Sequence, residues 1–178
     1  MDIVEFRKKH IKSENWGNHI HADIIINGKS FADIAEEHER IAAVKGTGKY
    51  EAFEYVYDYA DDLYDALANN STLYSYDGVQ KPVMICAGCH EPECWGLWVS
   101  IDMNDDCVIW HDIKNPHMAV IKPGKTKFWI YDEFPSFRFD KKEYFTAMSN
   151  LKYIAEEAHH FRKLSYTERN SFEGFEYK

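Results

Sequence analysis

The chain has no apolar run close to the ~20 residues that a membrane-spanning helix requires. Its first ten residues mix charged and apolar side chains and contain no small-residue cleavage site, so we expect no secretory signal. These two absences predict a cytoplasmic protein that does not enter a membrane and that keeps its cysteines reduced.

Positive charge is in deficit, because 21 lysines and arginines face 30 aspartates and glutamates, which gives a formal net charge of −9. A surface of that sign repels phosphates, which argues against a nucleic-acid binder and favours a basic protein as a macromolecular partner. The apolar fraction of 45% is still sufficient for a packed core, and 178 residues suit one domain better than two.

Common catalytic motifs are missing as well. The chain contains no glycine-rich phosphate loop, no His-Glu-x-x-His and no Gly-x-Ser-x-Gly. Cys89 and His111 could form a nucleophile pair only if the fold brought them together. We therefore expect a binding protein and not an enzyme.

No lysine or arginine occurs between Glu51 and Asp77, although this segment carries seven acids and seven aromatic residues. The apolar side chains of the segment follow the three-and-four spacing of a helix over residues 53–67, and most of the acids would point away from that buried stripe. The stripe consists of Phe53, Val56, Tyr57, Ala60, Leu63, Tyr64 and Leu67.

This acidic segment has two interpretations. A run of charge is often only the solvated face of a helix. It is also suited to docking, because carboxylates attract a basic partner and tyrosines supply stiff contact area. The candidate partner-binding residues are Glu54, Tyr57, Asp58, Tyr59, Asp61, Asp62, Tyr64 and Asp65.

Three of the four cysteines lie within ten residues, between two strand-like segments. Cys86 and Cys89 have the Cys-x-x-Cys spacing of a zinc knuckle, and Cys94 is a third candidate ligand. His90 is the first candidate for the fourth ligand, with His111 and His117 as further options. A second Cys-x-x-Cys pair is missing, so two alternatives without a cofactor are also considered. Either the cysteines stay reduced and pack a hairpin end, or two of them form a disulfide or redox pair.

Periodicity predicts one α+β domain over residues 1–178, with a mainly antiparallel sheet flanked by about three helices. The tail at 165–178 is either loose or packed across the domain. Strands are expected at about 3–6, 22–26, 82–86, 96–102, 107–112 and 126–131, and helices at 30–44, 53–67 and 140–161. The first helix should begin after an N-cap at Ser30 and bury Phe31, Ile34, Ala35 and Ile41, and the last should begin after Asp140.

Over roughly residues 20–155 the chain resembles a widespread group of uncharacterised bacterial proteins. In that group an INGxxL strand–turn–helix precedes a CxCGxxGCW hairpin, a VxW strand and a late Phe-Asp helix start. This chain has Ile26-Asn27-Gly28, then Gly88 to Trp95, then Val108-Ile-Trp110, and then Phe139-Asp140. It departs from the group in two ways: two residues instead of one separate Cys86 from Cys89, and His90 stands where glycine is common.

Small acidic proteins of this kind resemble the immunity proteins of contact-dependent growth inhibition and other polymorphic toxin systems. The resemblance implies a cytoplasmic immunity protein that binds a basic toxin domain and blocks its active site. The alternative is a zinc-binding regulatory or enzymatic module centred on Cys86, Cys89 and Cys94.

Overall fold

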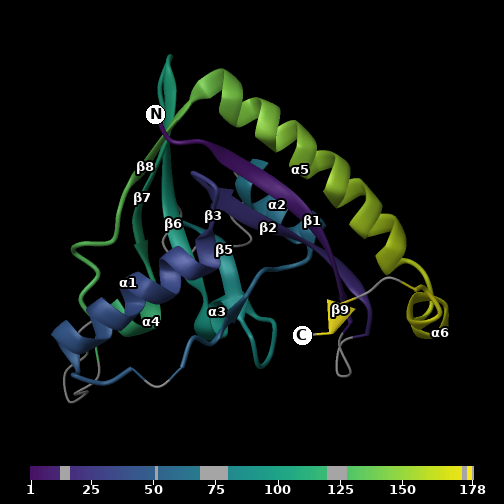
Figure 1. Cartoon of the computed structure of the whole chain (residues 1–178), viewed down its shortest axis with the longest axis horizontal. Helices are drawn as coiled ribbons and strands as arrows, with labels where there is room; N and C mark the ends of the chain where they lie inside the picture. Colours follow the sequence, from purple (N-terminus) through teal and green to yellow (C-terminus); the bar gives the residue numbers. More distant parts are fainter. Residues whose placement is uncertain (13–16, 51, 69–79, 120–127, 174–175, 178) are drawn as a thin grey trace.

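Two β-sheets form the frame of the protein, and the computed structural model describes residues 1–12, 17–50, 52–68, 80–119, 128–173 and 176–177 (Figure 1). The first sheet has the order β3-β2-β1-β9, and the second has the order β4-β5-β6-β7-β8. All the neighbouring strands pair antiparallel except β1 and β9. The strands are β1 (Val4–Lys12), β2 (His19–Ile26), β3 (Lys29–Ser30), β4 (Tyr55–Val56), β5 (Gln80–Cys86), β6 (Leu97–Met103), β7 (Cys107–Lys114), β8 (Phe137–Asp140) and β9 (Glu176–Tyr177).

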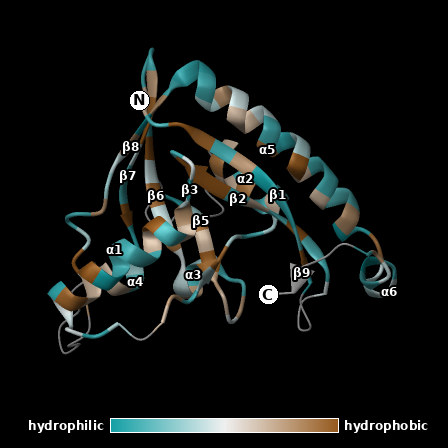
Figure 2. Cartoon of the chain, viewed as in Figure 1, coloured by the Kyte–Doolittle hydropathy of each residue, from teal (hydrophilic) through white to brown (hydrophobic). Residues whose placement is uncertain are grey.

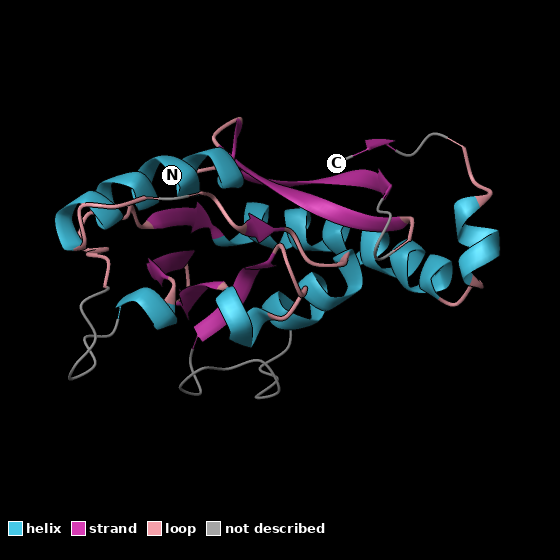
Figure 3. Cartoon of the chain, turned by 90° about the horizontal axis from the view of Figure 1, so that it is seen from below, coloured by secondary structure: helices cyan, strands magenta, loops and turns pink. Residues whose placement is uncertain are grey.

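Three longer helices and three short ones accompany the sheets. They are α1 (Phe31–Gly46), α2 (Ala60–Ala68), α3 (Pro92–Trp95), α4 (Pro116–Ala119), α5 (Lys141–Arg162) and α6 (Tyr166–Asn170). Helix α5 runs along β1 and β2 and also packs against α2, whereas α1 lies apart from α5, with strands between them (Figures 1 and 3). No helix among the described residues is long and apolar enough to cross a membrane. The predicted α+β architecture is confirmed.

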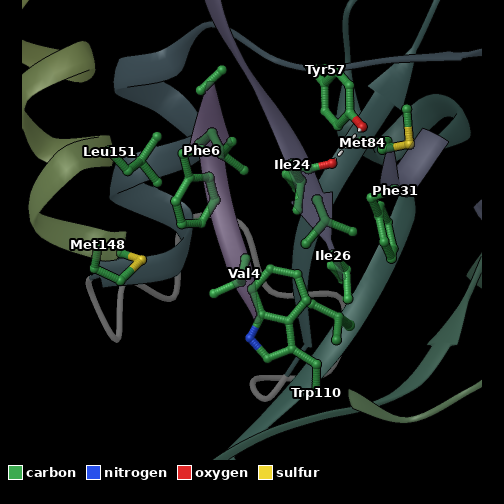
Figure 4. Close-up of a cluster of buried hydrophobic side chains, with 14 of the residues drawn as sticks. Val4, Phe6, Ile24, Ile26, Phe31, Tyr57, Met84, Trp110, Met148 and Leu151 are labelled. Carbon is green, nitrogen blue, oxygen red and sulfur yellow. Dashed lines mark hydrogen bonds between the residues drawn. The ribbon is translucent and has the colours of Figure 1, made fainter. Parts of the chain in front are cut away.

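The core joins the two sheets and the long helices. Helix α5 alternates between hydrophilic and hydrophobic residues along its length, as a helix with one buried face should (Figure 2). Its residues Met148 and Leu151 point toward Phe6 of β1, while Phe31 of α1 and Trp110 of β7 approach the same core from the other side (Figure 4). One core of this kind therefore connects both sheets with α1, α2 and α5.

The turn between β2 and β3 follows directly from its sequence. Asn27 and Gly28 have φ values of 53° and 80°, which a two-residue hairpin turn of the primed type requires. The turn pairs Ile26 with Lys29 and leads straight into α1. Helix α1 matches the prediction at 30–44, but Ile41 is wrong as a core residue, because 41% of its surface is exposed.

The predicted helix at 53–67 is wrong in its first half. Tyr55 and Val56 form the strand β4, which pairs with β5, and the helix α2 begins only at Ala60. Tyr55 and Tyr57 are both buried, at alternate positions of an extended chain. This period of two, with tyrosines that favour strands, outweighs the helical spacing on which the prediction relied.

The predicted strand at 126–131 is also wrong where the structure describes it, at 128–131. The backbone N–H of Trp129 donates to Met118 (2.7 Å) and that of Ile130 donates to Ala42 (3.0 Å), so this segment binds helix ends instead of a sheet. On the side of β7 opposite β6, the neighbouring strand is β8, which lies later in the chain and was not predicted.

The C-terminal tail packs onto the domain where it is described. Helix α6 begins with a capping box of Ser165 and Glu168. Its last turn binds the start of β2, because the backbone N–H of Asn18 donates to the side chain of Asn170 (3.1 Å) and the Asn18 amide donates to the carbonyl of Arg169 (3.1 Å). Of the two readings of this tail, these contacts favour packing across the domain.

Replacing Asp140 with alanine should lower the free energy of unfolding by about 1 kcal/mol. The Asp140 carboxylate accepts hydrogen bonds from the backbone N–H groups of Lys142 (2.9 Å) and Glu143 (3.0 Å) and so caps α5. Urea unfolding measures the change, and Asp140→Asn is the matched control because asparagine caps almost as well. Equal losses in both variants would contradict the capping role.

Candidate metal centre

The cysteines lie in the connection between β5 and β6. Cys86 is the last residue of β5, Cys89 follows in a turn, and Cys94 belongs to the short helix α3 just before β6. Gly96 links α3 to β6 at very close range, since a β-carbon there would overlap the carbonyl oxygen of Pro92 and lie 2.7 Å from Trp98 Nε1. The close approach of α3 to β6 therefore fixes where Cys94 lies.

The three sulfur atoms come together at one point. The Sγ atoms of Cys86, Cys89 and Cys94 all lie within 4.8 Å of one another, and all three are free thiols. A zinc ion bound at about 2.3 Å places tetrahedral sulfur ligands roughly 3.8 Å apart, so this spacing fits the ion. Cys94 is exposed and the other two are half-buried, which leaves one side of the cluster open to solvent.

The turn after Cys86 is closed by a backbone hydrogen bond and contains a residue with positive φ. The backbone N–H of His90 donates to the Cys86 carbonyl (2.9 Å) and closes the turn, while His90 takes a left-handed φ of 58°. Left-handed φ is easiest for glycine, so a non-glycine residue at this position is unusual.

The cluster shifts the pKa values of Cys86 and Cys94 in opposite directions. Burial raises the pKa of Cys86, but hydrogen bonds to its sulfur from the backbone N–H groups of Cys89 and Gly88 and from the neighbouring thiols bring the net pKa below its ordinary value. Hydrogen bonds to Cys89 and Cys86 raise the pKa of Cys94 to about 11, so Cys94 keeps its proton and donates it. Metal ions bind the thiolate form and displace such protons.

The histidine predicted as fourth ligand does not join the cluster. The ring of His90 lies near those of His19 (centroid distance 6.1 Å) and Tyr59 (6.3 Å), and neither ring nitrogen is close enough to all three sulfurs to share an ion with them. The other options fail too: His111 Nε2 binds Asp102 (3.1 Å), and His117 is outside the group of atoms close enough to share an ion. His90 as a ligand is therefore wrong, and so is the pairing of Cys89 with His111.

The acidic segment lies directly beside the cysteines, which the sequence did not indicate. Strand β4 pairs with the end of β5, with Tyr55 opposite Cys86. The backbone N–H of Ala87, inside the cysteine turn, donates to the carbonyl of Glu54 (3.0 Å). The two candidate sites from the sequence are thus neighbours in space.

The candidate partner-binding residues differ in how much of their surface is exposed. Glu54 and Asp65 are exposed, and Tyr64 is half-buried against the core. Tyr57 is buried: its hydroxyl accepts from the N–H of Ala32 (3.0 Å) and donates to the carbonyl of Ile24 (3.3 Å; Figure 4). Tyr57 is therefore wrong as a contact residue, because it has no surface to offer a partner. Glu51 and Asp77, at the ends of the acidic segment, lie outside the described residues.

The central acids of the segment are engaged by a distant arginine. Arg162 of α5 donates to Asp61 (3.3 Å) and Asp62 (2.7 Å), and its guanidinium stacks on the ring of Tyr59 at 4.9 Å. Asp58 accepts from the backbone N–H of Tyr59 (2.7 Å), and burial together with the charge of Asp62 raises the pKa of Asp58 to about 7. These acids lack cations nearby in the sequence but not in space.

The buried carboxyl of Glu39 was not predicted from the sequence. Glu39 of α1 is fully buried, and its Oε1 accepts hydrogen bonds from the hydroxyls of Tyr55 (2.6 Å) and Tyr131 (2.8 Å), while its Oε2 has no partner. Burial raises the pKa of Glu39 to about 7, although both hydrogen bonds act in the opposite direction. The available signal was its helical spacing, which places Glu39 on the buried stripe of Phe31 and Ala35.

A set of buried histidines was missed in the same way. His19 and His21 alternate along β2 and so share one face of the sheet. His21 Nε2 binds Asp23 (2.9 Å), and the ring of His19 lies 5.0 Å from that of Tyr59. The ring of His90 also lies near this face of β2, 6.1 Å from that of His19.

Three converging thiolates can hold a soft or borderline metal ion, with zinc the commonest choice for a Cys-x-x-Cys turn. The buried carboxyl and the histidines instead make contacts that hold helices and strands together. No family model, no curated protein and no solved structure matches the chain. The interpretation of the site therefore depends on its own geometry.

Proposed function

We propose that the protein binds zinc, with Cys86, Cys89 and Cys94 as three ligands of one ion. The observation that carries the proposal is the convergence of the three sulfur atoms within 4.8 Å of one another. Backbone N–H groups directed at the Cys86 sulfur support it, because they stabilise the thiolate that a metal needs. The ion would link α3 to the end of β5 and keep the connection between β5 and β6 in one conformation.

Protein purified without a metal-affinity tag should contain about one zinc per chain. Cys86→Ser and Cys94→Ser should each lose most of the metal, because two thiolates hold zinc far less tightly than three. Mass spectrometry of the metals and of the native protein measures both. Cys107→Ala is the matched control, since Cys107 is buried in β7 outside the cluster and its loss should leave the zinc in place. Reduced wild-type protein without zinc, or with another metal in its place, would refute the proposal.

The immunity protein is the second candidate, supported by two exposed carboxylates beside the cysteine turn or on α2. Glu54 and Asp65 are exposed, whereas Asp61 and Asp62 are half-buried and reversing either charge would break its contact with Arg162. Glu54→Lys and Asp65→Lys together should weaken binding to a basic toxin domain from the source strain by tenfold or more at low salt. Unchanged affinity in a calorimetric titration would remove these carboxylates from the interface.

A further inference from the structure

Every nitrogen and sulfur donor that could complete the zinc site can be located. All nine histidines and all four cysteines of the sequence fall within the described residues. In that part of the chain only three of them, the clustered cysteines, have ligand atoms close enough to share one ion. The chain therefore offers three soft ligands and no imidazole for a fourth position.

The remaining cysteine cannot reach the site. Cys107 is fully buried at the start of β7, opposite Asp140 of β8. Zinc in a closed structural site takes four protein ligands, whereas a site with three keeps a position for water or another molecule. The exposure of Cys94 places that position toward solvent.

The charge around the cluster selects among ligands for this position. Three thiolates and Zn²⁺ sum to a net charge of −1. The sequence has no lysine or arginine from 82 to 113, and the exposed residues Glu91 and Glu93 shortly precede Cys94. Arg162, near the ring of Tyr59, is already paired with Asp61 and Asp62. An anionic fourth ligand would bring the net charge of the ion and its ligands to −2, whereas a neutral donor leaves it at −1.

We propose that the fourth position on this zinc accepts a neutral nitrogen donor of the imidazole class, supplied by a histidine side chain from outside the chain. The inference depends on the proposed zinc site and adds to it the class of ligand that the site binds. The ion would then have two roles. It would link α3 to the end of β5, and it would join this chain to the molecule that supplies the histidine.

The test uses the full chain loaded with Co²⁺ in place of zinc, because the visible absorption of cobalt reports its ligands. Added imidazole should shift the cobalt bands in a saturable way and bind at least tenfold more tightly than azide. Cobalt that binds but responds to no added ligand, or that prefers azide, would overturn the inference. Failure to bind cobalt or zinc at all would instead refute the zinc site itself, so the two failures are distinguishable.

Carboxylates are the competing ligands within the chain. Glu91→Gln and Glu93→Gln should leave the cobalt spectrum unchanged in the absence of imidazole, and they should leave the affinity for imidazole within about twofold. A changed spectrum in either variant would show that a carboxylate occupies the fourth position and would overturn the inference.

The source of the histidine is resolved by the oligomeric state. A second copy of the chain would give a dimer that forms with zinc, dissociates in excess imidazole and is absent in Cys94→Ser. A histidine that belongs to a different protein would leave the purified, zinc-loaded chain monomeric, while the cobalt spectrum still responds to imidazole. Sedimentation with and without zinc separates these two sources, and a zinc-independent dimer that shields cobalt from imidazole would contradict both.

Discussion

Replacing Glu39 with glutamine should stabilise the protein by about 3 kcal/mol more at pH 8 than at pH 4, relative to the wild type at the same pH. The Glu39 carboxyl is fully buried, and folding raises its pKa from an ordinary value of 4.5 to about 7. The native state therefore holds the proton more tightly than the unfolded state does. The stability that this proton provides is complete below pH 4.5 and is lost as the pH rises through 7.

The structural reason is the partner set of the carboxyl. Tyr55 and Tyr131 both donate to Oε1, which leaves the second oxygen of an ionised Glu39 without a hydrogen bond in an apolar surrounding. Glutamine keeps the oxygen that the two tyrosines need and carries no charge at any pH. Glu39→Ala would lose that oxygen and should be destabilising across the whole range.

Urea unfolding at a series of pH values, followed by tryptophan fluorescence, measures the difference between variant and wild type. Glu37→Gln is the control, because Glu37 is exposed on the same helix and its ion pair with Lys29 (2.8 Å) lowers its pKa. Its difference from wild type should run in the opposite direction and be small. Parallel stability curves for wild type and Glu39→Gln would contradict a titrating buried carboxyl.

The sequence predicted the parts of the fold in which one periodic pattern dominates. Helix α5 is recognisable because its buried residues keep helical spacing over about four turns and Asp140 caps its start. Strands β5, β6 and β7 are recognisable because their apolar residues are dense and turn residues separate them. From Phe53 to Tyr59 the apolar residues fit both helical spacing and the alternation of a strand. The pairing of Tyr55 with Cys86 on β5, which is remote in sequence, favours the strand.

The sequence was sufficient to predict which cysteines form the cluster, but not which side chains surround them. Sequence spacing identifies Cys86, Cys89 and Cys94, since a turn of two residues brings thiols together in most contexts. It could not show that His90 turns toward His19, because β2 lies about 70 residues earlier in the chain. It also could not show that Arg162 reaches Asp61 and Asp62, a contact that only the packing of α5 on α2 creates.

Replacing Gly96 with alanine should cost about 2–3 kcal/mol of stability and weaken zinc binding by tenfold or more. The added β-carbon would overlap the carbonyl oxygen of Pro92 and crowd Trp98 Nε1, which itself donates to that carbonyl (3.3 Å). Gly96 has an ordinary φ of −112°, so the penalty comes from this overlap and not from backbone strain. Relief of the overlap moves α3 away from β6 and carries Cys94 away from the other two sulfurs.

Gly88→Ala is the matched control in the same loop. A β-carbon at Gly88 meets only the Cys86 sulfur, at an ordinary contact distance of 3.7 Å, so this variant should lose less than about 1 kcal/mol and keep its zinc. Urea unfolding and competition with a coloured chelator measure the two effects. If Gly96→Ala loses stability but keeps its zinc affinity, the position of the Cys94 sulfur does not depend on the contact between α3 and β6. Equal behaviour of the two glycine variants would mean that α3 does not need its close contact with β6, and the position of Cys94 would then have to be set by the metal itself.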